Sequence, residues 1–151
     1  MAMQFDISAM EKKHTFDIAE IEKVCFSRPW SQKSIENELE NESAYFYVAI
    51  ENGNVAGYCG THIVLDECYI ANIAVLPKYR GNGLGKLLTE HLINTAKKND
   101  CAFITLEVRP SNTVAVKMYE KLGFKVLGKR KNFYSSPIED GLIMTLYFTN
   151  K

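Results

Sequence analysis

The spacing of apolar side chains alternates between the periods typical of helices and of strands, and each change marks a predicted element. Four segments carry apolar residues three or four positions apart and are bounded by capping or breaking residues. Ser31 and Asn112 are the expected N-terminal caps of two of them, and Gly123 is an expected C-terminal cap. The predicted helices cover residues 15–26, 31–39, 84–98 and 112–122.

Segments rich in β-branched and aromatic residues predict seven strands around these helices. Asn52-Gly53 predicts a hairpin after the first strand, and residues 129–141 are expected to form a loop between the last two. The expected strands are 44–50, a second strand from Val55, a third over 58–64, and then 68–75, 102–108, 124–128 and 142–148.

The passage from residue 68 to residue 108 has the order strand, helix, strand, which makes its two strands parallel. Residues 70–76 are apolar except for Asn72, so this strand should be covered on both faces and central in the sheet. The chain contains no internal repeat or linker. We therefore expect a single domain over residues 1–151, of mixed α/β class, with the parallel pair 68–75 and 102–108 at its centre and four flanking helices.

A glycine-rich turn joins the central strand to the helix that begins at residue 84. Glycine lets the backbone approach a ligand closely, and the start of a helix presents unpaired N–H groups. The spacing matches neither the P-loop nor the G-x-G-x-x-G motif, which disfavours nucleotide hydrolysis and hydride transfer. The turn is either a tight connection or a cradle for a pyrophosphate, with cationic side chains at both ends. Its residues are Arg80, Gly81, Gly83, Gly85 and Lys86.

Glu107 interrupts the buried strand 102–108 near its C-terminal end, where ligands bind in open α/β sheets. An apolar site would raise the pKa of this carboxyl towards neutrality, which suits a general base. The alternative is a structural ion pair with Arg109 or another base.

Two residues of the next helix are further candidates. Tyr119, on its core face, is either a packing residue or an acid that protonates a leaving group. Asn112, at its start, is either a helix cap or a ligand contact.

Composition narrows the remaining classes of protein. Eighteen basic and eighteen acidic residues give a formal net charge of zero, so composition alone provides no case for nucleic acid or an anionic membrane. No signal peptide and no apolar stretch of membrane-spanning length is evident, and we expect a cytoplasmic location. The four cysteines lack metal-ligand spacing, so we expect no metal and reduced, mostly buried thiols at Cys25, Cys59, Cys68 and Cys101.

The motifs together resemble the GNAT superfamily of acetyl-CoA-dependent N-acetyltransferases, in which the loop similar to Arg80-x-x-Gly83-x-Gly85 binds the CoA pyrophosphate. Within that superfamily the chain is similar to the ribosomal-protein-alanine N-acetyltransferase family from about residue 15 onward. Phe133 and Leu142 depart from this family's usual tyrosine and alanine, which concerns the acceptor more than the chemistry. The resemblance rests on Pro29-Trp30-Ser31, Asn72-Ile73-Ala74-Val75, Leu106-Glu107-Val108-Arg109, Ser111-Asn112, Tyr119-Glu120-x-Leu122-Gly123-Phe124, Asn132-Phe133-Tyr134 and Glu139-Asp140.

The resemblance implies a role for each matching residue. Glu107 corresponds to the general base and Tyr119 to the general acid, while Glu67 and His62 are rival bases. Backbone groups of Ile73, Ala74 and Val75 would run beside the pantetheine arm of acetyl-CoA, and one of their amides would donate to the thioester oxygen. The other cofactor contacts implied are Arg80, Gly81, Asn82, Gly83, Leu84, Gly85, Lys86 and Asn112. The candidate acceptor contacts are Trp30, Glu67 and Tyr134, for which the alternatives are core packing by Trp30 and Tyr134 and a solvated turn at Glu67.

The implied activity is transfer of an acetyl group from acetyl-CoA to the N-terminal amino group of a protein, in particular the N-terminal alanine of a small-subunit ribosomal protein. Glu107 would accept the proton of the ammonium group, directly or through water, and Tyr119 would protonate the departing thiolate. Another protein N-terminus, a lysine or a small amine is the alternative acceptor. A non-catalytic acetyl-CoA-binding module is the alternative of another class. We expect a monomer or weak dimer that requires no nucleic acid and no membrane.

Overall fold

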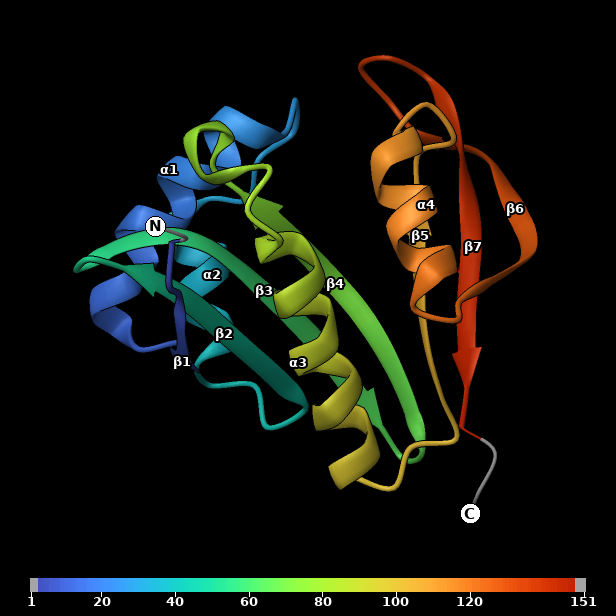
Figure 1. Cartoon of the computed structure of the whole chain (residues 1–151), viewed down its shortest axis with the longest axis horizontal. Coiled ribbons are helices and arrows are strands. Elements are labelled where there is room, and N and C mark those ends of the chain that lie inside the picture. Colours follow the sequence, from blue (N-terminus) through green and yellow to red (C-terminus); the bar gives the residue numbers. More distant parts are fainter. Residues whose placement is uncertain (1–2, 149–151) are drawn as a thin grey trace.

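The computed structural model describes residues 3–148, which fold around one seven-stranded mixed sheet (Figure 1). The strand order is β1-β2-β3-β4-β5-β7-β6, so β4 is the middle strand. β4 and β5 pair parallel, and the other described pairs are antiparallel. The strands are β1 (Asp6–Ala9), β2 (Ala44–Glu51), β3 (Asn54–Val64), β4 (Glu67–Val75), β5 (Phe103–Val108), β6 (Lys125–Tyr134) and β7 (Glu139–Tyr147).

Helices cover both faces of the sheet, as an α/β sequence pattern predicts. The first pair packs on one face over Val48 and Tyr58, and the second pair packs on the other face over Ile104 and Met144 (Figure 1). The first pair is α1 (Thr15–Cys25) and α2 (Gln32–Glu38), and the second is α3 (Leu84–Lys98) and α4 (Thr113–Lys121). Short 3₁₀ turns precede α1 (Lys12–His14) and follow β4 (Pro77–Tyr79).

The mixed α/β class, the four helices and the central parallel pair are confirmed. Two predicted caps are also confirmed, because the side chain of Ser31 accepts a hydrogen bond from the amide of Ser34 and that of Asn112 accepts one from the amide of Ala115. Gly123 adopts φ +104°, a left-handed conformation that favours glycine just after a helix.

Three strand predictions are wrong in detail. β1 is absent from the predicted strands, because four residues carry too short a pattern and its structure depends on pairing with the edge of β2. Residues 54–64 form one strand rather than two, since Gly57 permits close packing instead of breaking the strand: a Cβ there would lie 2.6 Å from the carbonyl oxygen of Ala74. The expected loop 129–141 is largely a hairpin, because β6 continues to Tyr134 and β7 already begins at Glu139.

The expectation that β4 is covered on both faces is also wrong in part. Cys68 and Ala74 are buried, but the other residues of the strand keep some exposure and Tyr69 is 41% exposed. The cause is the geometry of the sheet, because β4 pairs with β5 only at its start and then diverges from it (Figure 1). The apolar run therefore borders an opening rather than a closed core.

Gly60 in β3 offers a test of the packing beneath α1 and α2. A Cβ at this position would lie 2.4 Å from Cε2 of Phe46, whose buried ring stacks on Tyr58 at 6.4 Å between centroids. We expect Gly60→Ala to lower the free energy of unfolding by about 1–3 kcal/mol through overpacking, measured by denaturant titration. Gly128→Ala is the matched control, because a Cβ there meets nothing within 4 Å. Equal stability of the two variants would contradict this account of the Phe46 packing.

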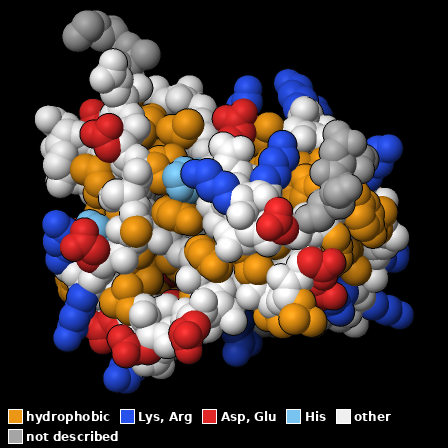
Figure 2. All heavy atoms as spheres, turned by 90° about the horizontal axis from the view of Figure 1, so that it is seen from below, with side chains coloured by type: hydrophobic (Ala, Val, Ile, Leu, Met, Phe, Trp, Pro, Cys, Tyr) orange, Lys and Arg blue, Asp and Glu red, His pale blue; other side chains and the backbone are white. Residues whose placement is uncertain are grey.

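The surface carries both signs of charge, in agreement with the zero net charge. Figure 2 shows Lys, Arg, Asp and Glu side chains interspersed with apolar ones over the face seen from below. Among the described helices, none is long and apolar enough to cross a membrane.

Candidate active site

The divergence of β4 from β5 leaves a free backbone edge in the middle of the sheet. The parallel pairing includes Glu67 with Phe103, Cys68 with Ile104 and Tyr69 with Thr105, and no further pair follows in the described chain. Residues 70–75 of β4 thus pair with β3 on one side and lack a strand partner on the other. An extended, peptide-like ligand can add to such an edge through backbone hydrogen bonds. Ile73, Ala74 and Val75, all expected to contact the cofactor, lie on this edge.

A β-bulge changes the direction of β4 at the start of the free edge. Gly60 of β3 lies opposite Asn72 and Thr61 lies opposite Ile70, so Ala71 is the extra residue. A bulge bends its strand and increases its twist. The bulge allows the side chain of Asn72 to point towards α1, where its Nδ2 donates to Glu22 at 2.8 Å.

The far end of the free edge is closed by side chains. Arg80 Nε donates to the carbonyl oxygen of Val75 at 3.0 Å, and Cys25 Sγ donates to the same oxygen at 3.5 Å. Arg80 Nη2 also lies 3.5 Å from Cys25 Sγ. The guanidinium of Arg80, expected at the phosphate, is therefore engaged in holding the end of β4.

The glycine turn has the conformation that its sequence predicts. Gly81 and Gly83 adopt φ +82° and +79°, and Asn82 Nδ2 donates to the carbonyl oxygens of Tyr79 at 3.0 Å and Arg80 at 3.3 Å. Helix α3 begins at Leu84 with no side chain hydrogen-bonded to its first amides and no acidic residue in its first turn. Those N–H groups and the partial positive charge of the helix remain available to an anion. Leu84 is 1% exposed, so only its backbone can contribute.

A groove of about 610 Å³ runs beside this turn, between α3 and α4. Three lysines and one glutamate line it, Lys86, Lys117, Lys121 and Glu90, so cationic groups predominate, while Val114, Met118 and Leu122 provide apolar ones. Gly85 contacts this groove, because a Cβ on it would lie 3.6 Å from Sδ of Met118. The groove can therefore accept a ligand that combines negative charge with a flat apolar group.

Glu107 lies in polar surroundings rather than in the apolar site expected. Its side chain is 28% exposed, and its Oε2 accepts a hydrogen bond from Nε of Arg130 at 2.9 Å. The partner is a residue of β6 and not the neighbouring Arg109. Glu107 lies two residues beyond Thr105, the last residue of β5 that pairs with β4, and therefore on the part of β5 that borders the opening.

Tyr119 packs into the core by its ring. The residue is 8% exposed and its ring lies 5.5 Å from that of Phe124. Burial raises the pKa of its phenol above the ordinary value, and Tyr134 adds to the shift. The phenol makes no hydrogen bond within residues 3–148. Every fully buried side-chain oxygen in that range has a hydrogen-bond partner, so the hydroxyl of Tyr119 must reach solvent.

Tyr134 at the end of β6 is electrostatically coupled to both catalytic candidates. Burial raises its pKa to about 12, with a further contribution from Glu107. Its phenol in turn raises the pKa of Tyr119. The ring lies 4.4 Å from the guanidinium carbon of Arg109, which fixes its orientation. The structure thus brings Glu107, Tyr119 and Tyr134 into one neighbourhood.

The remaining predicted residues occupy different places. Trp30 is partly buried in the loop between α1 and α2 and packs on Phe46, while Asn112 caps α4. Glu67 lies at the opposite end of β4 from the glycine turn and accepts a hydrogen bond from Tyr69. His62 lies 2.9 Å from Glu38 of α2. His62 therefore belongs to a different region from Glu107, whereas Glu67 is linked to it through Tyr69, whose phenol lies within electrostatic reach of Arg130, the partner of Glu107.

The sequence did not show the roles of three residues that organise this region, although two of them, Arg109 and Glu139, belong to the motifs named above. Arg109 donates to the carbonyl oxygens of Pro137 and Ser135 and to Glu139, which anchors the β6–β7 turn. Partial burial pushes the pKa of Glu139 up, but hydrogen bonds from Ser111 and Arg109 hold it below its ordinary value. Glu22 is the third. It lies four residues after Ile18, on the apolar face of α1, and that position is the signal that could have marked it.

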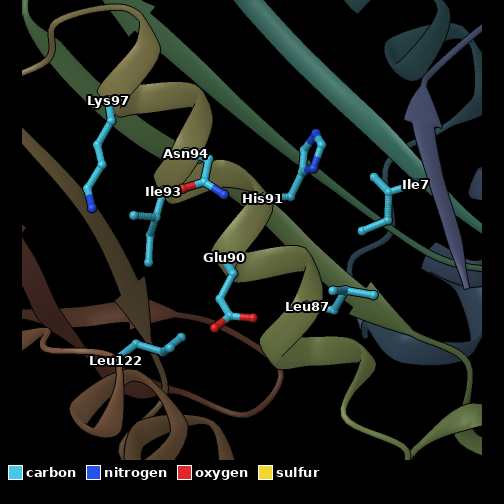
Figure 3. Close-up of a pocket in the computed structure, with 8 residues that line it drawn as sticks. All are labelled: Ile7, Leu87, Glu90, His91, Ile93, Asn94, Lys97 and Leu122. Carbon is cyan, nitrogen blue, oxygen red and sulfur yellow. The ribbon is translucent and has the colours of Figure 1, made fainter.

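The hollow shown in Figure 3 is a separate feature and none of the predicted site residues lines it. Its volume is about 480 Å³, and Glu90, Asn94 and Lys97 project over it from α3, with Leu122 and Ile7 at its sides. The chemistry is therefore better placed at the free edge of β4.

A free strand edge beside a glycine turn at a helix start can hold a ligand that is both phosphorylated and peptide-like. Comparison with known proteins agrees. A model of the acetyltransferase (GNAT) family matches residues 15–124. The chain therefore belongs to this family and is an N-acetyltransferase.

Named relatives resemble the chain over most of its length. A Bacillus subtilis protein, provisionally named ribosomal protein bS18-alanine N-acetyltransferase, is 43% identical over 128 residues, which is 84% of this chain and 85% of that protein. The ribosomal protein bS18-alanine N-acetyltransferase of Escherichia coli (strain K12) is 38% identical over 142 residues, 93% of this chain and 95% of that protein. The crystal structure of the ribosomal-protein-S18-alanine N-acetyltransferase from Escherichia coli superposes with a TM-score of 0.89 at 36% identity, covering 98% and 96% of the two chains.

Proposed function

We propose that the protein transfers the acetyl group of acetyl-CoA to the N-terminal alanine of a small-subunit ribosomal protein, the homologue of bS18. The observation that carries the proposal is the free edge of β4, residues 70–75, between the glycine turn and Glu107. The names of the relatives supply the acceptor. A cytoplasmic location, where ribosomal proteins are made, is part of the proposal, as is a single chain or weak dimer acting without nucleic acid or membrane.

The residues present fit acetyl-CoA, which supplies an activated acetyl thioester. Backbone groups on the free edge at Ile73, Ala74 and Val75 would bind its amide-containing arm, except for the carbonyl of Val75, which Arg80 and Cys25 already engage. The amides at the start of α3 and residues 81–86 would hold the pyrophosphate. The lysine-bearing groove between α3 and α4 would receive the nucleotide end.

The protein's own groups would divide the proton transfers between them. Glu107 would accept a proton from the ammonium group of the acceptor, either directly or through water. A backbone N–H of the free edge would donate to the carbonyl oxygen as negative charge develops there. Tyr119 would donate its proton to the departing sulfur, since its raised pKa keeps the phenol protonated at neutral pH.

The acceptor would enter between the α1–α2 loop and the β6–β7 turn. Arg28 Nη1 of the loop donates to Oγ of Ser135 in the turn at 3.0 Å, so the two segments meet. Trp30 and Tyr134 lie near this contact in sequence and would contact the first residues of the acceptor. Glu67 would have at most a peripheral role, because it lies at the far end of β4.

A peptide assay tests the proposed function. We expect a peptide beginning with alanine, with the sequence of the homologous bS18 N-terminus, to gain one acetyl group on its α-amine, located by tandem mass spectrometry. Release of CoA should be stoichiometric with that modification. The matched control is the same peptide with a blocked N-terminus and an unmodified lysine, which should remain unchanged.

The alternatives give different results in this assay. Acetylation of the blocked peptide or of a polyamine, with no turnover on any α-amine, would favour a lysine or small-amine acetyltransferase and overturn the proposal. Binding of acetyl-CoA with no CoA release for any amine would favour a non-catalytic module.

A further inference from the structure

Glu22 of α1 is the only buried acidic side chain among residues 3–148, and it is 0% exposed. It forms no ion pair with a lysine, arginine or histidine in that range. Burial raises the pKa of its carboxyl, while hydrogen bonds from the amide of Trp30 and the phenol of Tyr58 oppose the shift. A buried carboxylate without a cation costs free energy unless its oxygens accept hydrogen bonds. Its partners therefore explain how it is tolerated.

The three partners of this carboxylate come from three different segments. Oε1 accepts a hydrogen bond from the backbone N–H of Trp30 at 2.9 Å. Oε2 accepts hydrogen bonds from the phenol of Tyr58 at 2.5 Å and from Nδ2 of Asn72 at 2.8 Å. Nδ2 of Asn72 also lies 3.1 Å from the oxygen of Tyr58, which makes the network closed. One side chain thus joins α1, the α1–α2 loop, β3 and β4.

The network connects the two sides of the proposed active site. Asn72 is at the bulge where β4 leaves β5, so its position sets where the free edge begins. Trp30 lies in the α1–α2 loop, which forms the acceptor wall, the side of the proposed site along which the acceptor would enter. Its ring packs on Phe46 at 6.2 Å between centroids. Glu22 thus holds the backbone of Trp30, and Phe46 holds the side chain of Trp30.

We propose that Glu22 is a positioning residue for acetyl transfer, which fixes the acceptor-side loop at Trp30 against the donor strand at Asn72. The inference rests on the proposed function, because it takes β4 as the donor strand and the Trp30 loop as the acceptor wall. Glu22 touches neither substrate, since it is sealed in the core with Tyr58, which is also 0% exposed. Misplacing reacting groups by about 1 Å can lower a rate about 100-fold, so a rigid tie between the two walls matters to the reaction.

Two substitutions at residue 22 separate positioning from simple packing. Glu22→Met keeps the length and apolar bulk of the side chain but accepts no hydrogen bond from Trp30 or Asn72. Glu22→Gln keeps an oxygen for the amide of Trp30, and its NH₂ group can donate to Asn72 once that amide turns over. We expect kcat/KM for the acceptor peptide to fall 10- to 100-fold in Glu22→Met, with a raised KM, and to stay within threefold of wild type in Glu22→Gln. Affinity for CoA should change less than threefold in both, because none of the four hydrogen bonds of this network reaches the glycine turn, which would anchor the pyrophosphate.

The loop position can be measured without any acceptor. Trp30 is the only tryptophan in the sequence, so intrinsic fluorescence reports on this loop alone. We expect acrylamide to quench Trp30 more strongly in Glu22→Met than in wild type or Glu22→Gln. Glu20→Met is the matched control, because Glu20 is exposed on the same helix and pairs only with Lys23. It should leave both quenching and kcat/KM unchanged.

An exchange of groups tests the contact between Glu22 and Asn72 directly. Asn72→Asp places a second carboxylate against the first and should lower kcat/KM at least 10-fold. Adding Glu22→Gln to Asn72→Asp restores a donor and acceptor pair, and should return kcat/KM to within threefold of Glu22→Gln alone.

The results distinguish failure of this inference from failure of the proposed function. A folded Glu22→Met protein with wild-type quenching and kcat/KM, or one that loses only thermal stability, would overturn the positioning role. If wild type acetylates no α-amine, the proposed function fails. In that case the Trp30 quenching series still decides whether Glu22 holds the loop, since unchanged quenching rejects the tie and increased quenching in Glu22→Met alone supports it.

Discussion

Glu107→Gln is expected to lower kcat for the acceptor peptide by about 10²- to 10⁴-fold, because the amide cannot accept the proton that the ammonium group must lose. The substitution keeps the shape of the side chain. The ion pair that it weakens involves Arg130, which is 58% exposed, so the effect on stability should be about 1 kcal/mol or less. Affinity for CoA should remain within twofold. Initial rates of CoA release and calorimetric binding measure the two quantities.

The pH dependence of the variant gives a second test of the base. An α-amino group has an ordinary pKa of about 7.7–8.0, so raising the pH converts the acceptor to its neutral, nucleophilic form without help from the enzyme. We expect the rate of Glu107→Gln to rise more steeply than that of wild type between about pH 7 and pH 9. Arg130→Met is the control, because it removes the ion pair but keeps the carboxylate. Wild-type turnover of Glu107→Gln near neutral pH would reject the assignment.

Tyr119→Phe is the second substitution with a large expected effect, a fall in kcat of about 10²- to 10⁴-fold through loss of the proton donated to the departing sulfur. The fold should tolerate it. The phenol makes no hydrogen bond within the described chain, and the ring keeps its contact with Phe124 at 5.5 Å. Stopped or continuous thiol detection of CoA release measures the rate, and denaturant titration confirms that the protein is folded.

The raised pKa of Tyr119 predicts the shape of the wild-type profile as well. A phenol whose pKa lies above its ordinary value keeps its proton to higher pH, so no loss of rate from this group should occur between about pH 7 and pH 10. Tyr47→Phe is the matched control, since it also removes a phenol, one that is hydrogen-bonded to Thr95 and lies on β2, three positions from β5 in the sheet. A folded Tyr119→Phe protein with wild-type activity would leave this residue with packing alone.

Local patterns in the sequence were sufficient to predict those features of the structure that depend on residues close together in the chain. The start and end of α4 follow from Asn112 and Gly123, and the glycine turn adopts the left-handed angles expected at Gly81 and Gly83. The parallel pairing of β4 with β5 follows from the handedness of the strand-helix-strand connection.

Distant contacts decided what these patterns could not. The apolar run of β4 predicts a covered strand, but the strand borders an opening because β5 turns away after Thr105. The pattern around Glu107 left open an apolar site or an ion pair with Arg109 or another base, and only the fold shows that the base is Arg130, which lies 23 residues further along the chain in β6.

The sequence by itself determined the fold class, the helices with their caps, the glycine turn and the two candidate catalytic side chains, because each depends on periodicity or on a short motif. Only the tertiary structure decided which of these residues meet. It placed Tyr134 within electrostatic reach of both Glu107 and Tyr119, opened the edge of β4, and joined Glu22 to Trp30 and, 50 residues further along the chain, to Asn72. The physical reason is that hydrogen bonds and strand divergence between distant segments are set by the packing of the whole sheet, which no local pattern encodes.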